Sequence, residues 1–223
     1  MGFIQTKPQL IIFDLDGTLV DSAGDIHHAA NQAFEAFKLP VQAIEDIKKW
    51  IGSGAAVFVE KALAHVNKKE CFDSFYPLFM HKYEQQTHCF SKLYDGVEPF
   101  LKLAHSHQIP LAIASNKPFA LIAPVLQHFK IDGYFQRVLG GDSLIYKKPD
   151  PLPLHTLCEE FAVHPEECWM IGDSDKDALA AIAANMPFIG VSYGYQDNHK
   201  ALMTSKVPNK IVDNLVELEE YLV

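Results

Sequence analysis

The chain has 223 residues, of which 48% are hydrophobic and 21% are charged, an ordinary globular composition that suffices for one large domain or two small ones. Its 19 basic and 28 acidic residues give a net charge of −9, so the overall field does not attract nucleic acid or an anionic membrane, and neither is expected as a partner. The sequence shows no signal-peptide pattern and no apolar run of about eighteen residues, so we expect a cytoplasmic protein. The widely spaced cysteines are expected to be reduced thiols: Cys71, Cys89, Cys158 and Cys168.

The first informative segment is the apolar run Leu10–Phe13, which is followed directly by Asp14, Asp16 and Gly17. A short hydrophobic run that ends in a glycine-containing turn predicts a buried strand whose tip opens into a loop. Two carboxylates at such a tip repel each other unless something compensates their charge. A divalent cation and a phosphorylated substrate could use both, with one Asp attacking phosphorus and the other handling the leaving group's proton. A strand end followed by a polar turn is the plainer interpretation of this motif alone.

Residues 21–94 indicate a helical block inserted after this first strand. The segment has no convincing strand but has amphipathic patterns, separated by Pro40 and by Gly52-Ser53-Gly54. The expected helices are Ala23–Phe37, Ala43–Trp50, Ala55–Val66 and Phe72–Gln86. We therefore predict a small all-helical cap domain over residues 21–94, with linkers near residues 21–22 and 93–96, and a core made of residues 1–20 and 95–223.

From residue 95 onward, strand-like apolar runs alternate with helical patterns. The expected strands are Leu111–Ala114, Arg137–Leu139, Cys168–Ile171, Phe188–Ser192 and, more weakly, Lys210–Val212. The expected helices are Val97–His107, Phe119–Phe129, Pro153–Phe161 and Lys176–Ala184. This alternation predicts an α/β fold with a Rossmann-like parallel sheet core and helices on both faces. Ligands bind at the carboxyl ends of the strands in such sheets, so Asp14, Ser115 and Asp173 are expected to converge on one edge.

Three further motifs carry groups suited to phosphate chemistry. Ser115 and Asn116 follow a predicted strand and offer a hydroxyl and backbone N–H groups to phosphate oxygens. Lys148 precedes a predicted helix and would act as a compact cation beside a phosphoryl group. Asp173 and Asp177 are four residues apart at the start of a helix, so they share a face. Singly, these motifs are also compatible with a helix N-cap, a solvated lysine and an acidic helix start. Those readings do not explain why the motifs occur together.

The four aspartates of these motifs predict a bound cation. Without one, the meeting of Asp14, Asp16, Asp173 and Asp177 would raise some of their pKa values and destabilise the fold. The motifs offer oxygen ligands without Cys or His, which selects a hard ion, and Mg²⁺ fits best.

The motifs resemble those of the haloacid dehalogenase-like hydrolases over essentially the whole chain. The matching segments are Phe13–Ser22, Trp50–Ala55, Ser115–Pro118, Gly140–Asp142, Lys147–Pro151 and Gly172–Ser174. The second and fourth of these segments favour the branch of the family that hydrolyses 2-phosphoglycolate. Ser115 stands where Thr is common and keeps the hydroxyl, whereas Asp150 stands where that branch often has His.

The resemblance implies a Mg²⁺-dependent phosphatase that acts on a small phosphorylated metabolite through an aspartyl-phosphate intermediate. In this family pattern Asp14 is the nucleophile and Asp16 the general acid/base. Mg²⁺ is held by the Asp14 carboxylate, the Asp16 backbone carbonyl and Asp173.

The resemblance also assigns the groups that hold the phosphoryl group. Ser115 and Asn116 bind it, and Lys148 neutralises its charge. Asp177 supports Lys148 or the metal's waters from outside the ligand shell. The cap is expected to supply specificity as a lid that excludes water and bulky substrates. Within the cap, Gly52 and Gly54 either let the backbone approach the ligand or form a plain interhelical turn.

Several alternatives remain open at this point. A sugar-phosphate phosphatase or a phosphomutase of the same family is one, and a non-catalytic phosphate-binding module is another. A dehalogenase would not need Asp16. His27, His28, His105 and His107 are expected to be surface or packing residues, and composition leaves both a monomer and a homodimer open.

Overall fold

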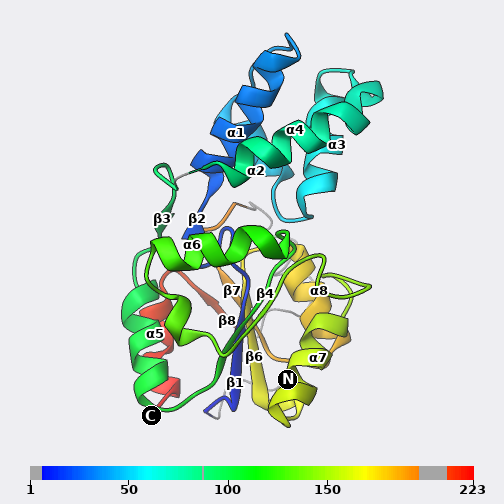
Figure 1. Cartoon of the computed structure of the whole chain (residues 1–223). Coiled ribbons are helices and arrows are strands. Elements are labelled where there is room, and N and C mark those ends of the chain that lie inside the picture. The colour runs from blue at the N-terminus through cyan, green and yellow to red at the C-terminus, as the bar shows by residue number, and fades with distance from the viewer. Residues whose placement is uncertain (1–6, 87, 196–209) are drawn as a thin grey trace.

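A computed structural model describes residues 7–86, 88–195 and 210–223 and places a six-stranded parallel sheet at the centre of the core (Figure 1). The strands lie in the order β5-β4-β1-β6-β7-β8. Their bounds are β1 Leu10–Phe13, β4 Leu111–Ala114, β5 Arg137–Leu139, β6 Cys168–Gly172, β7 Phe188–Val191 and β8 Lys210–Val212. Phe13 of β1 pairs with Ile113 on one side and Ile171 on the other. The carboxyl ends of β4, β1 and β6 therefore lie side by side.

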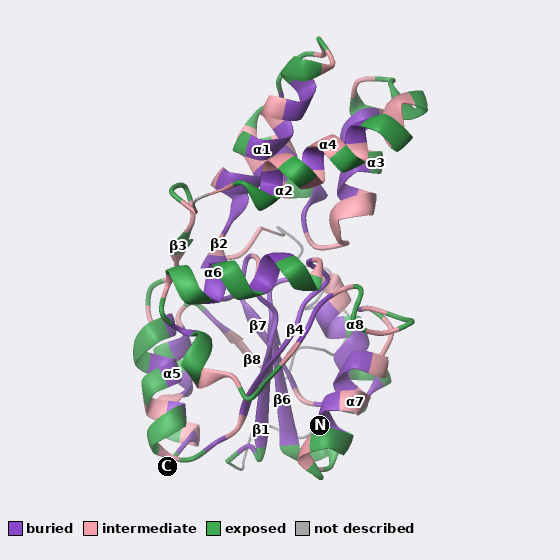
Figure 2. Cartoon of the chain, in the orientation of Figure 1, coloured by how far each residue is buried: buried purple, intermediate pink, exposed green. Residues whose placement is uncertain are grey.

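Helices cover both faces of this sheet (Figure 1). One face packs against α5 (Val97–Ser106), α6 (Ile122–His128) and the 3₁₀ helix η5 (Leu215–Tyr221), and the other packs against α7 (Leu152–Phe161) and α8 (Asp175–Ala183). Along β1, Ile11 and Phe13 enter the first cluster, and Leu10 and Ile12 enter the second. All four are fully buried (Figure 2). Burial on both faces explains why the sequence of this strand is a continuous apolar run. The predicted α/β class is confirmed.

The helices between β2 and β3 form the predicted helical cap above the carboxyl edge of the sheet (Figure 1). They are α1 Ala23–Ala36, α2 Ile44–Trp50, α3 Ala55–His65 and α4 Phe72–Glu84. These helices share a third hydrophobic cluster with buried aromatic contacts, such as Phe34 against Phe75 and Phe58 stacked on Phe79. The cap thus has apolar packing of its own, and burial of this packing stabilises it.

Both chain crossings between core and cap run through a short antiparallel ribbon. Its strands are β2 (Val20–Asp21) and β3 (Lys92–Leu93), with Val20 opposite Leu93 and Asp21 opposite Lys92. Linkers without a strand were predicted here, because two residues are too few to show a periodic pattern.

Other departures from the predicted elements have local causes. The segment predicted as a helix over Phe119–Phe129 is a 3₁₀ turn at Phe119–Leu121 followed by α6. Pro124 has no backbone N–H and is best tolerated in the first turn of an α-helix, which is where α6, beginning at Ile122, places it. η5 was missed altogether, and it starts at a capping box in which Asn214 and Glu217 bond each other's backbone. No helix in the described ranges is long and apolar enough to cross a membrane.

Candidate active site

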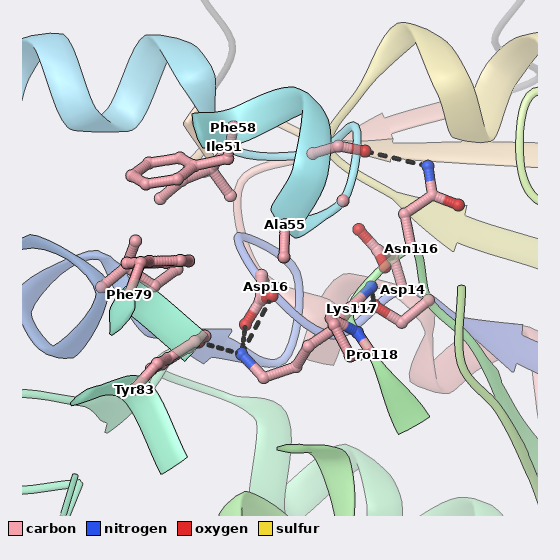
Figure 3. A pocket seen from close by; sticks show the side chains of 14 residues that line it. Asp14, Asp16, Ile51, Ala55, Phe58, Phe79, Tyr83, Asn116, Lys117 and Pro118 are labelled. Carbon is pink, nitrogen blue, oxygen red and sulfur yellow. Dashed lines mark hydrogen bonds and ion pairs between the residues drawn. The ribbon is translucent and has the colours of Figure 1, made fainter. Parts of the chain in front are cut away.

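A cavity lies between the cap and the carboxyl ends of β1 and β4. The core contributes loop residues that follow these strands, and the cap contributes mainly apolar side chains (Figure 3). The lining residues are Asp14, Asp16, Ile26, Ile51, Gly52, Gly54, Ala55, Phe58, Phe79, Tyr83, Ser115, Asn116, Lys117 and Pro118. The structure thus brings candidates from the first strand, the second core motif and the cap to one place.

A buried cluster of carboxylates adjoins this cavity. Asp14, Asp173 and Asp177 each place a carboxylate oxygen within 4.8 Å of the others. Lys148 inserts among them, with Nζ 3.1 Å from Asp14 Oδ1 and 2.5 Å from Asp177 Oδ1, and its side chain is only 2% exposed. Three negative groups therefore share one positive group where water is nearly excluded.

Burial and mutual repulsion determine the protonation of this cluster. Burial, together with the charges of Asp177 and Asp16, raises the pKa of Asp14 to about 6, although Lys148 opposes the shift. Burial, Asp177 and Asp14 raise the pKa of Asp173 well above its ordinary value. For Lys148, burial favours the neutral amine, but Asp14 and Asp177 outweigh burial and raise its pKa. The lysine stays charged and two of the carboxylates are short of positive charge.

Asp177 ties the start of α8 to Lys148. Its Oδ2 accepts hydrogen bonds from the backbone N–H of Ser174 (3.0 Å) and from Ser174 Oγ (2.6 Å), while its Oδ1 contacts Lys148. This arrangement forms a capping box at the N-terminus of α8. Of the two roles proposed for Asp177 from the sequence, the geometry favours support of Lys148.

The carboxylate of Asp16 points away from this cluster. Ser22 Oγ donates to its Oδ1 at 2.6 Å, and Lys117 Nζ lies 2.9 Å from Oδ1 and 3.2 Å from Oδ2 (Figure 3). Lys117 also donates to the hydroxyl of Tyr83 on α4. Burial favours the neutral amine of Lys117, but Asp16 and Tyr83 outweigh burial and raise its pKa. The side chain of Asp16 thus sits in an ion pair that reaches the cap.

Asn116 connects the cap to the core instead of pointing its amide at the cavity. Its Nδ2 donates to the carbonyl of Gly52 at 3.0 Å and to that of Lys148 at 2.9 Å. Lys147 Nζ donates to Ser53 O at 2.9 Å and reinforces the same junction. Ser115 Oγ accepts from the backbone N–H of Lys117 at 3.3 Å. The amide nitrogen of Asn116 is therefore engaged by one carbonyl group of the cap and one of the core.

Two glycines permit close approaches in the site. Gly17 has φ +90°, and a Cβ there would lie 2.4 Å from Asp173 Oδ2. Gly54 has φ +89°, and a Cβ there would lie 2.8 Å from Lys147 Nζ and 2.9 Å from Asn116 O. Any other residue would be strained in this conformation and would displace these neighbours.

Sequence reasoning did not single out Lys117, Tyr83, Tyr195 or Ser22 as site residues. Lys117 was part of a motif, but the phosphate-binding role predicted for that motif was given to Ser115 and Asn116. Tyr195 donates its backbone N–H to Asp173 Oδ2 at 2.8 Å, and its hydroxyl accepts the backbone N–H of Ser22 at 2.6 Å. No spacing rule connects these residues, because they meet only through the tertiary fold.

Other sequence candidates lie outside the cavity. Asp150 Oδ1 accepts the backbone N–H of Leu152, the first residue of α7, at 2.9 Å. His27 Nε2 lies 3.0 Å from Gln42 O within the cap, a packing position. Asp142 Oδ1 accepts the backbone N–H of Phe119 at 2.7 Å and holds the loop after β4.

The fold and the site together define the class of protein. The family model described as haloacid dehalogenase-like hydrolase matches residues 11–191, and the chain belongs to this family. The predicted enzyme class, a hydrolase of phosphoric monoesters, is confirmed at this level.

The relatives narrow the comparison further. Phosphoglycolate phosphatase 1 of Pseudomonas aeruginosa is 36% identical over 222 residues, covering 97% of this chain and 80% of the relative. A phosphoglycolate phosphatase of Vibrio vulnificus (strain YJ016) is 37% identical, covering 96% of both chains. The crystal structure of a predicted phosphoglycolate phosphatase from Haemophilus somnus superposes with a TM-score of 0.91 at 33% identity, covering 97% of this chain and 98% of that one.

The charge balance around Lys148 gives a stability prediction. Replacement of Lys148 by Met leaves the buried carboxylates uncompensated, so the metal-free variant is expected to lose about 3–5 kcal/mol of unfolding free energy at pH 7.5. Urea denaturation measures this loss of unfolding free energy. The loss should be smaller at pH 5, where protonation of Asp14 relieves the repulsion. Lys147→Met is the matched control, and an equal loss in that variant would contradict the interpretation.

Proposed function

We propose that the chain hydrolyses 2-phosphoglycolate to glycolate and phosphate through an aspartyl-phosphate formed on Asp14. The observation that carries the proposal is the position of Asp14 at the tip of β1, where it lines the cavity and contacts Lys148. Support for the substrate comes from the names of the relatives and from the small, largely apolar cavity under the cap. Support for the metal comes from the neighbouring carboxylates.

The chemistry proceeds in two displacements. A carboxylate oxygen of Asp14 forms a bond to phosphorus while the bond from phosphorus to the ester oxygen breaks, and the leaving alkoxide takes a proton from Asp16. Water then attacks the phosphorus of the aspartyl-phosphate, Asp16 accepts the proton of that water, and inorganic phosphate leaves. Before the first step Asp16 must leave its ion pair with Lys117, take up a proton from solvent and turn toward the ester oxygen. In the second step it regains that proton from the attacking water.

Groups of this chain position and neutralise the phosphoryl group. Ser115 and Asn116, which follow β4, line the cavity together with Asp14, and the Ser115 hydroxyl can donate to a phosphoryl oxygen. Lys148 places a permanent positive charge next to the attacking oxygen. Because phosphoryl transfer relies on positioning and charge neutralisation, this preorganised environment supplies much of the acceleration.

The residues present fit a magnesium ion. Asp14 and Asp173 are buried carboxylates with too little positive charge beside them. The metal-ligating atoms that the described part of the chain gathers here are carboxylate oxygens. We infer that Asp14, Asp173 and the backbone carbonyl of Asp16 would hold Mg²⁺, with Asp177 outside the ligand set because both its oxygens are engaged. When bound, the ion neutralises charge on the phosphoryl oxygens.

The nucleophile assignment predicts the effect of one substitution. Asp14→Asn removes the attacking carboxylate with little change in size, so phosphate release should fall by about 10⁴-fold or more. Steady-state assay with 2-phosphoglycolate measures the loss, and circular dichroism checks the fold. Asp132→Asn, at an exposed position, is the control. Substantial activity in Asp14→Asn would remove Asp14 from this role.

The metal assignment predicts loss of activity in excess EDTA and recovery on addition of Mg²⁺. It also predicts a rise in melting temperature on addition of Mg²⁺ to metal-free protein, because the ion binds only the folded site. Turnover that persists in EDTA, without a melting shift, would contradict the assignment.

The same site makes the affinity for Mg²⁺ depend on pH. Burial raises the pKa of Asp14 to about 6, so Asp14 is protonated below that pH and Mg²⁺ must displace the proton. Protonated Asp14 stabilises the metal-free fold at low pH, and this stabilisation is lost as pH rises through about 6. The melting shift caused by Mg²⁺ should therefore be larger at pH 7.5 than at pH 5, and Asp14→Asn should reduce the difference.

A panel of phosphate monoesters tests the substrate. The apolar walls Ile26, Ile51, Phe58 and Phe79 offer few partners for sugar hydroxyls, so kcat/KM for 2-phosphoglycolate should exceed that for glucose 6-phosphate by about 100-fold. Faster hydrolysis of the sugar phosphate would refute the substrate and leave the reaction class in place.

A further inference from the structure

Lys117 is a buried cation for which the hydrolysis described above has no use. Its side chain is 1% exposed. Among the described residues that line the cavity, Lys117 is the one that carries a positive charge. Lys148 serves the phosphoryl end of the site, so Lys117 has to be explained separately. Lys117 lies between the loop that follows β4 and helix α4, so its positive charge is placed under the cap.

The partners of Lys117 hold its ammonium group in one place. It contacts both carboxylate oxygens of Asp16, donates to the Tyr83 hydroxyl, and lies 4.7 Å from the centre of the Tyr83 ring (Figure 3). Tyr83 is itself buried and belongs to the cap. A lysine held by an ion pair, a hydroxyl and a ring face keeps little of its usual rotamer freedom.

Turnover requires this arrangement to change. In the proposed reaction the carboxyl group of Asp16 turns toward the ester oxygen and leaves Lys117. The ammonium group would then be a buried cation without an anion, which is strongly unfavourable. A second anionic group on the substrate would restore the balance by taking the place of Asp16.

We propose that Lys117, oriented by Tyr83, binds the carboxylate of the substrate and thereby selects short phosphate monoesters that carry an acid group. The inference rests on the proposed function and extends it from the phosphoryl end of the substrate to the other end. Binding of the acid group releases Asp16 from Lys117, so a correct substrate frees the residue that protonates its own leaving group. The apolar remainder of the cavity suits the short carbon chain between the two anions.

The test compares two esters of equal length, 2-phosphoglycolate and 2-hydroxyethyl phosphate, which differ in the carboxylate. The wild-type ratio of their kcat/KM values should be at least about 30 in favour of the acid. Lys117→Met should bring the ratio to within about threefold of one. Lys147→Met alters a neighbouring cation that contacts Ser53 O instead, and should keep the wild-type ratio.

A second variant keeps the test valid if Lys117→Met does not fold. Tyr83→Phe retains the buried ring and removes only the hydroxyl that orients Lys117. It should raise KM for 2-phosphoglycolate more than it lowers kcat, and should reduce the ratio by about threefold to tenfold. Tyr76→Phe, on the same helix, is its control. Thermal melting verifies that each variant is folded.

The outcomes separate this inference from the proposed function. An equal loss on both esters in Lys117→Met would show that Lys117 acts only through Asp16, and would overturn the carboxylate site. A wild-type ratio near one would also overturn it, while hydrolysis that depends on Asp14 would leave the phosphatase chemistry intact. If 2-phosphoglycolate is a poor substrate, 3-phosphooxypropanoate is compared with 3-hydroxypropyl phosphate. Preference for the acid there supports the site for a different skeleton, and its absence refutes the site.

Discussion

The geometry of the site is constrained by three buried carboxylates at the carboxyl edge of the sheet, which have fewer positive charges beside them than they need. Asp14, Asp173 and Asp177 are buried within 4.8 Å of one another and share Lys148. Such a cluster is expensive unless its charges are compensated, so it persists only because the sheet and α8 hold the groups in place. The same shortage is the reason for proposing a cation site here.

The backbone makes this concentration of charge possible. The pairing of Phe13 with Ile171 sets the next residues of the two strands, Asp14 and Gly172, at adjacent strand ends, and Asp173 follows at once. The absence of a side chain at Gly17 lets the loop after β1 lie against Asp173. Because both faces of β1 are buried, a shift in its register would place carboxylates in the core. The apolar packing of the sheet and the geometry of the site constrain each other.

Sequence patterns were sufficient where the signal was local. The buried strands, the alternation with helices and the cap were visible as periodicity, and the acidic tips of β1 and β6 identified the edge where the site lies. The family resemblance then named Asp14, Asp16, Ser115, Lys148 and Asp173. Patterns failed where a role arises from tertiary contact. The Asn116 amide joins two carbonyls instead of facing the cavity, and Lys117 meets Tyr83 across 34 positions of sequence. No periodicity encodes such meetings.

The β2–β3 ribbon sets the condition that any segment replacing the cap would have to meet. The chain leaves the core at Asp21 and returns at Lys92, and these residues are directly opposite each other. An insert therefore has to supply only two adjacent ends to be accommodated, whatever its length or secondary structure. The six-stranded sheet would keep its register under such a replacement. A core of this kind can be combined with caps of different size, so that one wall of the cavity changes while the residues at the strand ends stay in place.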